Sequence, residues 1–200
     1  MDFIQVISYF GTFVFAVTGA LKARKYQMDV LGAAVMAFVA AYGGGTVRDI
    51  LIGIRPLSWM NDYLALFLVS LAVAIVFMLN KKEIKFQRAI LITDAMGLGF
   101  FTALGIFKSL QAGINGGYAI IMGTIGATFG GLLADIISNT VPDLLKKGEL
   151  YATACLIGGT IQIILYKQGV DEKTTLMVCV LIVFIVRIVS KWKRIYLPEI

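Results

Sequence analysis

Two full charges, Arg48 and Asp49, lie within a long apolar stretch of the chain, residues 28–54. They come directly after three glycines in the segment Tyr-Gly-Gly-Gly-Thr-Val-Arg-Asp, residues 42–49. Glycine destabilises a helix by about 1 kcal/mol per residue relative to alanine. A charge inside a bilayer costs about 2.5–3.5 kcal/mol on insertion scales. If the stretch lies in a membrane, a weakened helix that carries charge is typical of a polar pathway through the bilayer.

The composition predicts an integral membrane protein. Of the 200 residues, 59% are hydrophobic and 15% are charged, whereas soluble domains are about 25% charged. The net charge of +6 is better explained by basic loops on one side of a membrane than by nucleic-acid binding. The sequence has no histidine, and residues 43–49 lack the Lys-Ser/Thr ending of a phosphate-binding loop. We therefore expect no enzymatic activity, no cofactor, no resident metal ion and no nucleic-acid partner.

Seven apolar runs predict seven transmembrane helices, because about 20 apolar residues cross a hydrocarbon core of about 30 Å. The runs are residues 3–21, 28–54, 63–79, 89–107, 117–139, 150–166 and 174–190. The connections between them are short, so the chain is predicted to form one structural domain.

Lysine and arginine are distributed unevenly when successive loops are assigned to alternate sides of the membrane. One side receives twelve, namely Lys22, Arg24, Lys25, Lys81, Lys82, Lys85, Arg88, Lys146, Lys147, Lys191, Lys193 and Arg194. The other side receives four, namely Arg55, Lys108, Lys167 and Lys173. Because cytoplasmic loops are enriched in these residues, the N-terminus is expected outside and the C-terminus in the cytoplasm.

The sequence contains an internal repeat with an offset of 86 residues and no gap. Matched pairs are Gly11 and Gly97, Lys22 and Lys108, Gly44 and Gly130, Gly45 and Gly131, Asp49 and Asp135, and Pro56 and Pro142. Each repeat holds three spans, so the second copy enters the membrane from the opposite side, as in inverted-repeat transporters. The predicted fold is all-α, with inverted three-helix repeats at residues 1–80 and 81–167 and a seventh helix with a basic tail at residues 168–200.

Glycines and hydroxyl side chains within the spans are candidate site residues. The glycines are Gly43, Gly44, Gly45, Gly130 and Gly131. They are predicted to break the second and fifth helices, where freed carbonyl groups could meet cations in a water-filled pathway. The alternative is that these small residues only let helices pack closely. The candidate polar lining residues, unless they bond back to their own helices, are Thr18, Thr46 and Ser138.

Charged side chains are the remaining candidates for a pore or its gating, and they are Lys22, Arg48, Asp49, Asp94, Lys108 and Asp135. Adjacent residues do not face each other on a helix. Arg48 is therefore expected to bridge acidic groups of the other repeat, with Asp94 and Asp135 as candidates. Such contacts could be purely structural ion pairs, and the two lysines could instead extend to the membrane interface.

Three of these features together resemble a known family. They are Gly-Gly-Gly-x-x-Arg-Asp in the second span, a shorter Gly-Gly-x-x-x-Asp copy at residues 130–135, and seven spans arranged as 3+3+1. The chain resembles the prokaryotic TRIC (trimeric intracellular cation) channels and the related bacterial membrane family whose repeated domain is called a glycine transporter domain. The resemblance covers essentially the whole chain. It implies a homotrimer in a prokaryotic cell membrane, with one pore in each protomer that passes K⁺ and Na⁺.

The leading functional hypothesis is a passive channel for monovalent cations in the lipid bilayer. Asp49 and Asp135 would supply a negative field, and the glycine carbonyl groups would coordinate passing ions. The rival is a carrier for a small amino acid such as glycine. A half-helix N-terminus would then bind the carboxylate and one of the two aspartates the amine. The same sequence features fit both hypotheses.

Overall fold

The computed structural model describes residues 2–79, 85–146, 150–193 and 195. Four of the basic residues counted above, Lys81, Lys82, Lys147 and Arg194, lie outside the described residues. The predicted boundary between the two repeats, at residues 80–81, also lies outside them.

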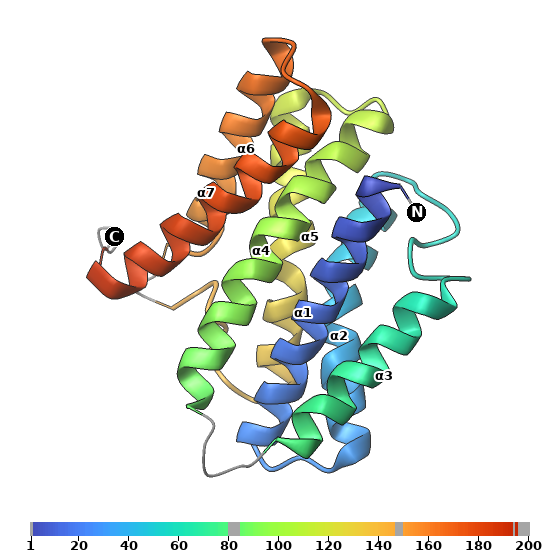
Figure 1. Ribbon diagram of the computed structural model, residues 1–200, viewed down its shortest axis with the longest axis vertical. Coiled ribbons are helices and arrows are strands. Elements are labelled where there is room, and N and C mark those ends of the chain that lie inside the picture. Colours follow the sequence, from blue (N-terminus) through green and yellow to red (C-terminus); the bar gives the residue numbers. More distant parts are fainter. Residues whose placement is uncertain (1, 80–84, 147–149, 194, 196–200) are drawn as a thin grey trace.

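Seven α-helices make up the described part of the chain, which contains no β-strand (Figure 1). They are α1 (Phe3–Lys25), α2 (Val30–Leu51), α3 (Tyr63–Met78), α4 (Phe86–Gln111), α5 (Gly116–Ile137), α6 (Ala152–Lys167) and α7 (Glu172–Lys193). Helices α1, α2, α4, α5 and α7 are long and apolar enough to cross a membrane. Helices α3 and α6 have 16 residues each, or about 24 Å at a rise of 1.5 Å per residue. The prediction of an all-α membrane protein with seven helices is confirmed.

The backbone carries the same repeat as the sequence. Helices α2 and α5 begin and end at positions that differ by the 86-residue offset. The residues that cap their N-termini with side-chain hydrogen bonds, Asp29 and Asn115, are repeat-mates, and two positions earlier Gln27 and Gly113 both have positive φ. In Figure 1, α1 runs opposite to α4, and α2 runs opposite to α5. The two three-helix units are therefore inverted relative to each other.

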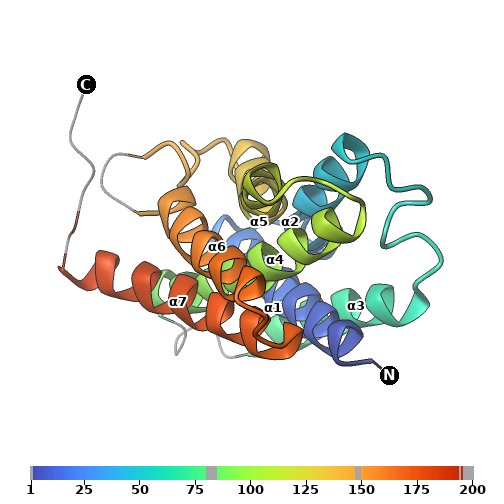
Figure 2. The ribbon, with the colours of Figure 1, turned by 90° about the horizontal axis from the view of Figure 1, so that it is seen from above.

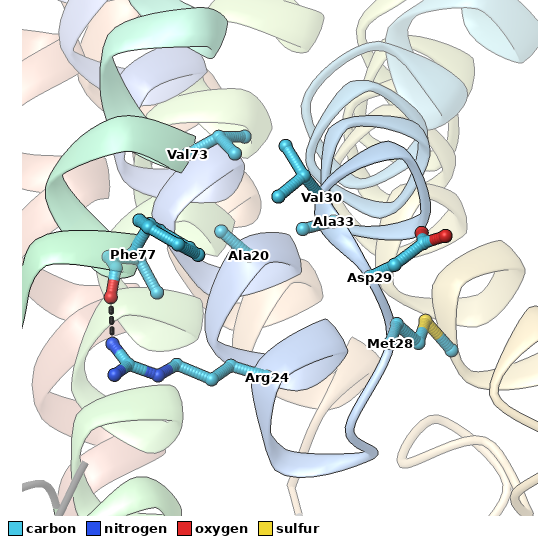
Figure 3. A pocket seen from close by; sticks show the side chains of 9 residues that line it. Ala20, Arg24, Met28, Asp29, Val30, Ala33, Val73 and Phe77 are labelled. Carbon is cyan, nitrogen blue, oxygen red and sulfur yellow. Dashed lines mark hydrogen bonds between the residues drawn. The ribbon is translucent and has the colours of Figure 1, made fainter.

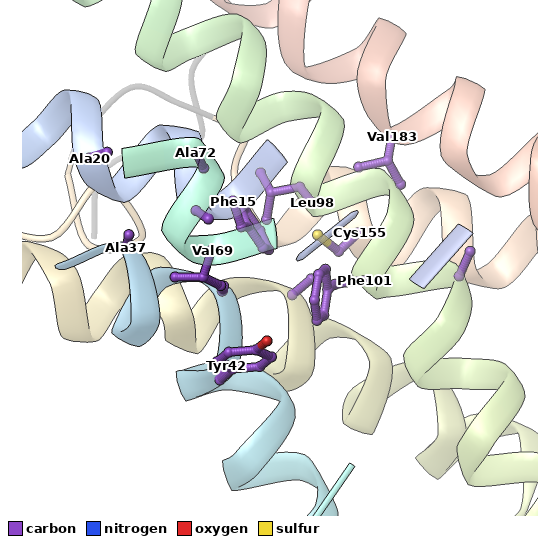
Figure 4. Packing of buried hydrophobic residues seen from close by; sticks show 14 of the residues in the cluster. Phe15, Ala20, Ala37, Tyr42, Val69, Ala72, Leu98, Phe101, Cys155 and Val183 are labelled. Carbon is purple, nitrogen blue, oxygen red and sulfur yellow. The ribbon is translucent and has the colours of Figure 1, made fainter. Parts of the chain in front are cut away.

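Four helices, α1, α2, α4 and α5, form the centre of the molecule, with α3 on one flank and α6 and α7 on the other (Figure 2). The main apolar core joins these layers. It includes Phe15 of α1, Tyr42 of α2 and Phe101 of α4, with Val69 and Val183 holding the flanking α3 and α7 (Figure 4). Both halves of the repeat thus pack on one shared core.

The glycines in α2 and α5 do not break these helices. Helix α2 continues through residues 43–45 and α5 through residues 130–131, so the predicted breaks are wrong. A Cβ atom added at Gly44 would lie 2.2 Å from the carbonyl oxygen of Gly126, and one at Gly130 would lie 2.3 Å from a carbonyl oxygen of α2. The glycines therefore let the backbones of α2 and α5 touch where the helices cross, which is the packing role of small residues.

Replacing Gly130 by alanine should destabilise the protein, because the new methyl group would overlap the α2 backbone. Overpacking of this kind costs about 1–3 kcal/mol, so the melting temperature in detergent should fall. Gly117→Ala is the matched control in the same helix, because the nearest atom to its added Cβ would be 3.7 Å away. Equal melting temperatures for the two variants would contradict the tight crossing of α2 and α5.

Candidate functional site

One end of the four-helix core carries a linked set of charged and polar groups. Asp49 is completely buried, and its Oδ1 accepts hydrogen bonds from Arg48 Nε at 3.0 Å and Nη2 at 2.6 Å. Its Oδ2 accepts a hydrogen bond from the backbone N–H of Ser58 at 3.0 Å. Lys108 Nζ of α4 donates to the Ser58 hydroxyl at 2.7 Å. The Asp49 carboxylate is therefore bonded through both oxygens, and α2, its following loop and α4 are joined.

The predicted partner of Arg48 is wrong. Neighbouring side chains diverge on a helix, but the arginine side chain is long enough to fold back to the adjacent Asp49. The two acidic residues expected to face Arg48, Asp94 and Asp135, bind other basic groups at the opposite end of the core. Arg48 thus balances the charge of the Asp49 carboxylate in its own helix and does not bridge the two repeats.

A small cavity, called here the first cavity, opens beside this cluster. Its charged lining residues are Arg48, Asp49, Asp62 and Lys108. Ser8 and Thr12 of α1 add hydroxyl groups, and Phe101 and Leu104 of α4 add an apolar wall. The cavity therefore offers groups of both charge signs, together with hydroxyls that can replace water around a small ion.

At the opposite end of the core, an ion pair joins the two repeats. Lys22 Nζ near the end of α1 donates to Asp135 Oδ1 of α5 at 2.6 Å, and both side chains are buried. The second oxygen, Oδ2, accepts a hydrogen bond from the backbone N–H of Asp143 at 3.0 Å. This end thus places a lysine of one repeat on an aspartate of the other.

Asp94 lies at this second end, in contact with groups that sequence reasoning missed. Tyr151 donates its hydroxyl to Asp94 Oδ1 at 3.0 Å, and Arg187 Nη2 of α7 lies 3.8 Å from Asp94 Oδ2. The Arg187 guanidinium also lies over the Tyr151 ring, 4.4 Å from its centroid. The sequence did show that Arg187 is a full charge inside the otherwise apolar seventh span, which indicates a functional or paired residue. Its partner could not be read from neighbouring residues.

A second cavity opens at this end, lined by charged side chains of both signs. They are Lys25, Asp94, Asp143, Lys146, Arg187 and Lys191. Lys146 Nζ donates to Asp143 Oδ1 at 2.5 Å. Burial alone would raise the pKa of Asp143, but this hydrogen bond and the nearby Lys22 charge hold the pKa below its usual value. Among the residues that the structure describes, no group of three or more His, Cys, Asp or Glu side chains is placed to hold a metal ion.

The two ends follow one plan, and the arginine next to the buried aspartate of the first end has no counterpart at the second. At the α1–α5 end, the lysine binds the aspartate directly. At the other end the equivalent lysine, Lys108, binds Ser58 because Arg48 already occupies Asp49. The repeat-mate of Arg48 is Ala134, so the second end has no corresponding arginine in α5.

The predicted polar lining residues do not line either cavity in this structure. Thr18 Oγ1 of α1 lies 2.8 Å from Thr93 Oγ1 of α4. Thr46 Oγ1 accepts a hydrogen bond from Trp59 Nε1 at 2.9 Å, and the Ser138 hydroxyl donates back to its own helix. These three hydroxyls bind protein groups. Thr18 contacts Thr93 of the other repeat, and the Ser138 hydroxyl also lies 4.0 Å from Met36 Sδ of α2.

A separate groove lies between α1, α2 and α3 (Figure 3). Most of its lining is apolar and comes from Ala20, Val30, Ala33, Val73 and Phe77. Arg24 at its edge donates to the backbone carbonyl oxygens of Val76 and Leu79, the latter at 2.6 Å. Arg24 thereby satisfies carbonyl groups at the C-terminal end of α3, and the groove is distinct from the two charged cavities.

The inverted repeat and the charged cluster at each end define a class of seven-helix membrane proteins with two related halves. The chain belongs to the family described as "Glycine transporter", whose family model matches it twice, at residues 5–81 and 91–167. The two matched ranges have the same 86-residue offset as the repeat.

Curated relatives cover most of the chain. The UPF0126 membrane protein of Vibrio cholerae is 36% identical over 186 residues, which is 92% of this chain and 77% of that protein. The UPF0126 inner membrane protein YadS of Escherichia coli is 32% identical over 190 residues, 94% of this chain and 91% of that one. The chain is thus an integral membrane protein with relatives of similar length.

Solved structures of prokaryotic TRIC channels share the fold. One, from work on conductance through TRIC cation channels, has a TM-score of 0.87 and 34% identity, and covers 100% of this chain and 98% of its own. The TRIC trimeric intracellular cation channel orthologue of Rhodobacter sphaeroides has a TM-score of 0.87 and 30% identity, with 96% and 100% coverage. The resemblance to prokaryotic TRIC channels is confirmed.

Removing the lysine of the buried Lys22–Asp135 pair should be strongly destabilising. Lys22→Met leaves an unpaired buried carboxylate, which costs about 3–5 kcal/mol. The double variant Lys22→Met/Asp135→Asn should recover part of this loss, because the amide needs no counter-charge. Thermal unfolding in detergent measures both effects.

The control is Lys146→Met, which removes the exposed partner of Asp143. Exposed pairs contribute about 0–1 kcal/mol, so this variant should melt close to the wild type. A Lys22→Met protein that melts like Lys146→Met would show that the buried pair does not hold the two repeats together.

Proposed function

We propose that this protein is a passive channel for monovalent cations, K⁺ and also Na⁺, with a pore inside each protomer of a homotrimer. The carrying observation is a charged cavity at each end of one four-helix core. The similarity to TRIC cation channels, at 34% and 30% identity over nearly the whole chain, supports the same function. The trimer is supported by the trimeric nature of the Rhodobacter sphaeroides orthologue. We infer a transport role and no enzymatic activity.

In this proposal the acidic residues attract cations to each end, and the lysines keep the pore closed. Asp49, Asp94 and Asp135 make each end attractive to cations, since rings or clusters of carboxylates are the usual basis of cation selectivity. Lys22 and Lys108 lie over the same ends and oppose cation entry until they move. Ion pairs at both ends therefore correspond to a closed state, and opening requires these pairs to separate.

The glycines would act during that opening. Gly43, Gly44 and Gly130 lie where α2 and α5 cross. Gly45 lines the first cavity, and Gly131 faces Tyr151 and Asp94 at the second end. Because glycine weakens a helix by about 1 kcal/mol relative to alanine, these positions are the ones at which either helix bends most readily. We therefore retain them as hinge residues, and Thr18, Thr46 and Ser138 as groups that could face the opened path.

A carrier for a small amino acid is the second candidate. The family to which the chain belongs is described as "Glycine transporter". The first cavity also combines Arg48 and Lys108 with Asp49 and Asp62. A zwitterion presents one carboxylate and one ammonium group, so a cavity with both charge signs matches it. The experiment below separates the two candidates.

Purified protein in planar bilayers should give discrete current steps in K⁺ and in Na⁺, because an open pore passes many ions per opening. Added glycine should leave these currents unchanged. Saturable glycine uptake into liposomes without discrete currents would favour the carrier instead. Arg48→Ala extends the same measurement, with the exposed Arg55→Ala as its control. If Arg48→Ala lowers stability but leaves the currents unchanged, Arg48 is a structural residue only.

We also propose that the N-terminus lies outside and the C-terminus in the cytoplasm. The described basic residues Lys25, Lys146 and Lys191 line the second cavity together. Arg24 and Lys85 belong to the end of α1 and the start of α4, which lie at one end of the molecule (Figure 1). Cytoplasmic segments carry such an excess of positive charge. The loop between α6 and α7 lies at the opposite end, on the same side as the N-terminus.

Cysteines introduced at Gly169 and Lys146 test this orientation in spheroplasts of expressing cells. The two native cysteines are buried, so they contribute little background. A membrane-impermeant maleimide should label Gly169→Cys and spare Lys146→Cys until the membrane is permeabilised. The reverse labelling would invert the proposed topology.

A further inference from the structure

Two phenylalanine rings separate the first cavity from the opposite end of the core. The rings of Phe15 in α1 and Phe101 in α4 are in contact, with centroids 5.1 Å apart and an interplanar angle of 37°. Their side chains are buried, and Phe101 also forms part of the inner wall of the first cavity. Figure 4 shows both residues within the packed centre of the molecule. The Phe101 ring therefore bounds the first cavity, and Phe15 packs behind it.

The spacing along α1 and α4 places the rings midway between the charged ends. Each helix carries a polar residue, a phenylalanine and a lysine at seven-residue intervals. The residues are Ser8, Phe15 and Lys22 in α1 and Asp94, Phe101 and Lys108 in α4. Seven residues are close to two turns, or about 10 Å, so each trio shares a helix face. Because the two helices run in opposite directions, both faces read polar, aromatic, polar across the membrane.

The two rings are held by reciprocal contacts with glycines. Phe15 and Phe101 are repeat-mates, as are Gly11 and Gly97. A Cβ atom added at Gly97 would lie 2.3 Å from Phe15 Cδ1, and one at Gly11 would lie 3.0 Å from Phe101 Cε2. Each ring therefore sits on a glycine of the other ring's helix, close to the axis that relates the two repeats.

A pair of rings in contact leaves no room for water between them. Ring centroids of packed aromatic pairs lie about 4.5–7 Å apart, and the distance of 5.1 Å places this pair in direct contact. A small cation cannot shed its water at an apolar contact that offers no replacement oxygen, and such constrictions gate by dewetting. On the far side of the rings, polar groups resume with the Thr18–Thr93 contact and then the Lys22–Asp135 pair.

We propose that Phe15 and Phe101 form a hydrophobic gate across the path between the two charged ends, and that opening requires at least one ring to leave its glycine. This inference rests on the proposed function, because a gate has meaning only if ions cross the protein. It differs from ordinary core packing in one respect. A core residue affects stability alone, whereas a gate residue controls passage in protein that remains folded.

Ion flux from K⁺-loaded liposomes tests the gate. Phe101→Ser and Phe15→Ser should each raise K⁺ flux by about tenfold or more, because a hydroxyl and the freed space admit water; a tenfold change corresponds to a barrier lower by about 1.4 kcal/mol. Phe101→Leu keeps the position apolar, so its K⁺ flux should stay well below that of Phe101→Ser. Phe10→Ser is the matched control on α1, since Phe10 is 60% exposed, and it should change nothing. Unchanged flux in folded Phe101→Ser and Phe15→Ser would overturn the gate.

A labelling experiment reads the barrier without ion current. Thr18→Cys, in a Cys155→Ala/Cys179→Ala background, places a thiol on the far side of the rings from the first cavity. A charged methanethiosulfonate applied from the first-cavity side should modify it slowly with Phe101 intact, and about tenfold faster or more after Phe101→Ser. Equal rates with and without the ring would overturn the inference.

The two experiments also separate this inference from the proposed function. Absence of any K⁺ flux from every variant would reject the channel. Wild-type flux that neither serine variant changes, with unchanged labelling of Thr18→Cys, would reject the gate and leave the channel standing. Size-exclusion profiles and melting temperatures establish that each variant is folded before it is scored.

Discussion

Burial of one aspartate at each end of the core is the constraint on which the rest of the structure depends. A carboxylate removed from water is costly unless both of its oxygens are bonded. Asp49 and Asp135 each meet this demand with one basic side chain and one backbone N–H from the loop that follows their helix. The loops must therefore fold back over the helix ends, and Lys22 must reach across from the other repeat. The Lys22–Asp135 pair thus adds a buried polar link to the apolar core that the two halves share.

The two ends share this solution but differ in what surrounds it. At the first end, α2 supplies its own counter-charge through Arg48. At the second end, an additional carboxylate, Asp94, stands where the first end has Ser8, and the seventh helix provides Arg187 beside it. Helix α7, which lies outside the repeat, thus balances the charge of Asp94, an acidic residue that the first repeat does not have. An inverted repeat with unequal ends presents different electrostatic surfaces to the two sides of the membrane.

The helices and the repeat could be predicted from the sequence because each produces a pattern that is visible along the chain. Apolar runs separated by charged loops mark the seven helices, and one uninterrupted offset aligns glycines, acids and prolines. The predicted breaks at residues 43–45 and 130–131 were wrong because helix propensity describes an isolated helix. In an apolar setting every backbone group must stay bonded, so the helix persists and the missing side chains become a contact surface for α2 and α5.

The partners of the charged residues were harder to predict. Charged side chains at Arg48, Asp94 and Asp135 were identified as candidates from their position in apolar sequence alone. Which of them would meet depended on the crossing of helices far apart in the chain, and Arg48 turned back to its neighbour instead. Tyr151 and Arg187 were missed for the same reason. Their contacts with Asp94 join α4 to the start of α6 and to α7, and no local pattern encodes that meeting.

The shortness of α3 and α6 has a mechanical consequence. Each has 16 residues, or about 24 Å of helix, against a hydrocarbon core of about 30 Å, and they lie on opposite flanks of the core (Figure 2). Such short helices are accommodated when the bilayer beside them thins or when flanking polar side chains reach the interface, at a cost of a fraction of a kcal/mol per Å of mismatch. The free energy of the protein therefore depends on bilayer thickness at both flanks of the central helices.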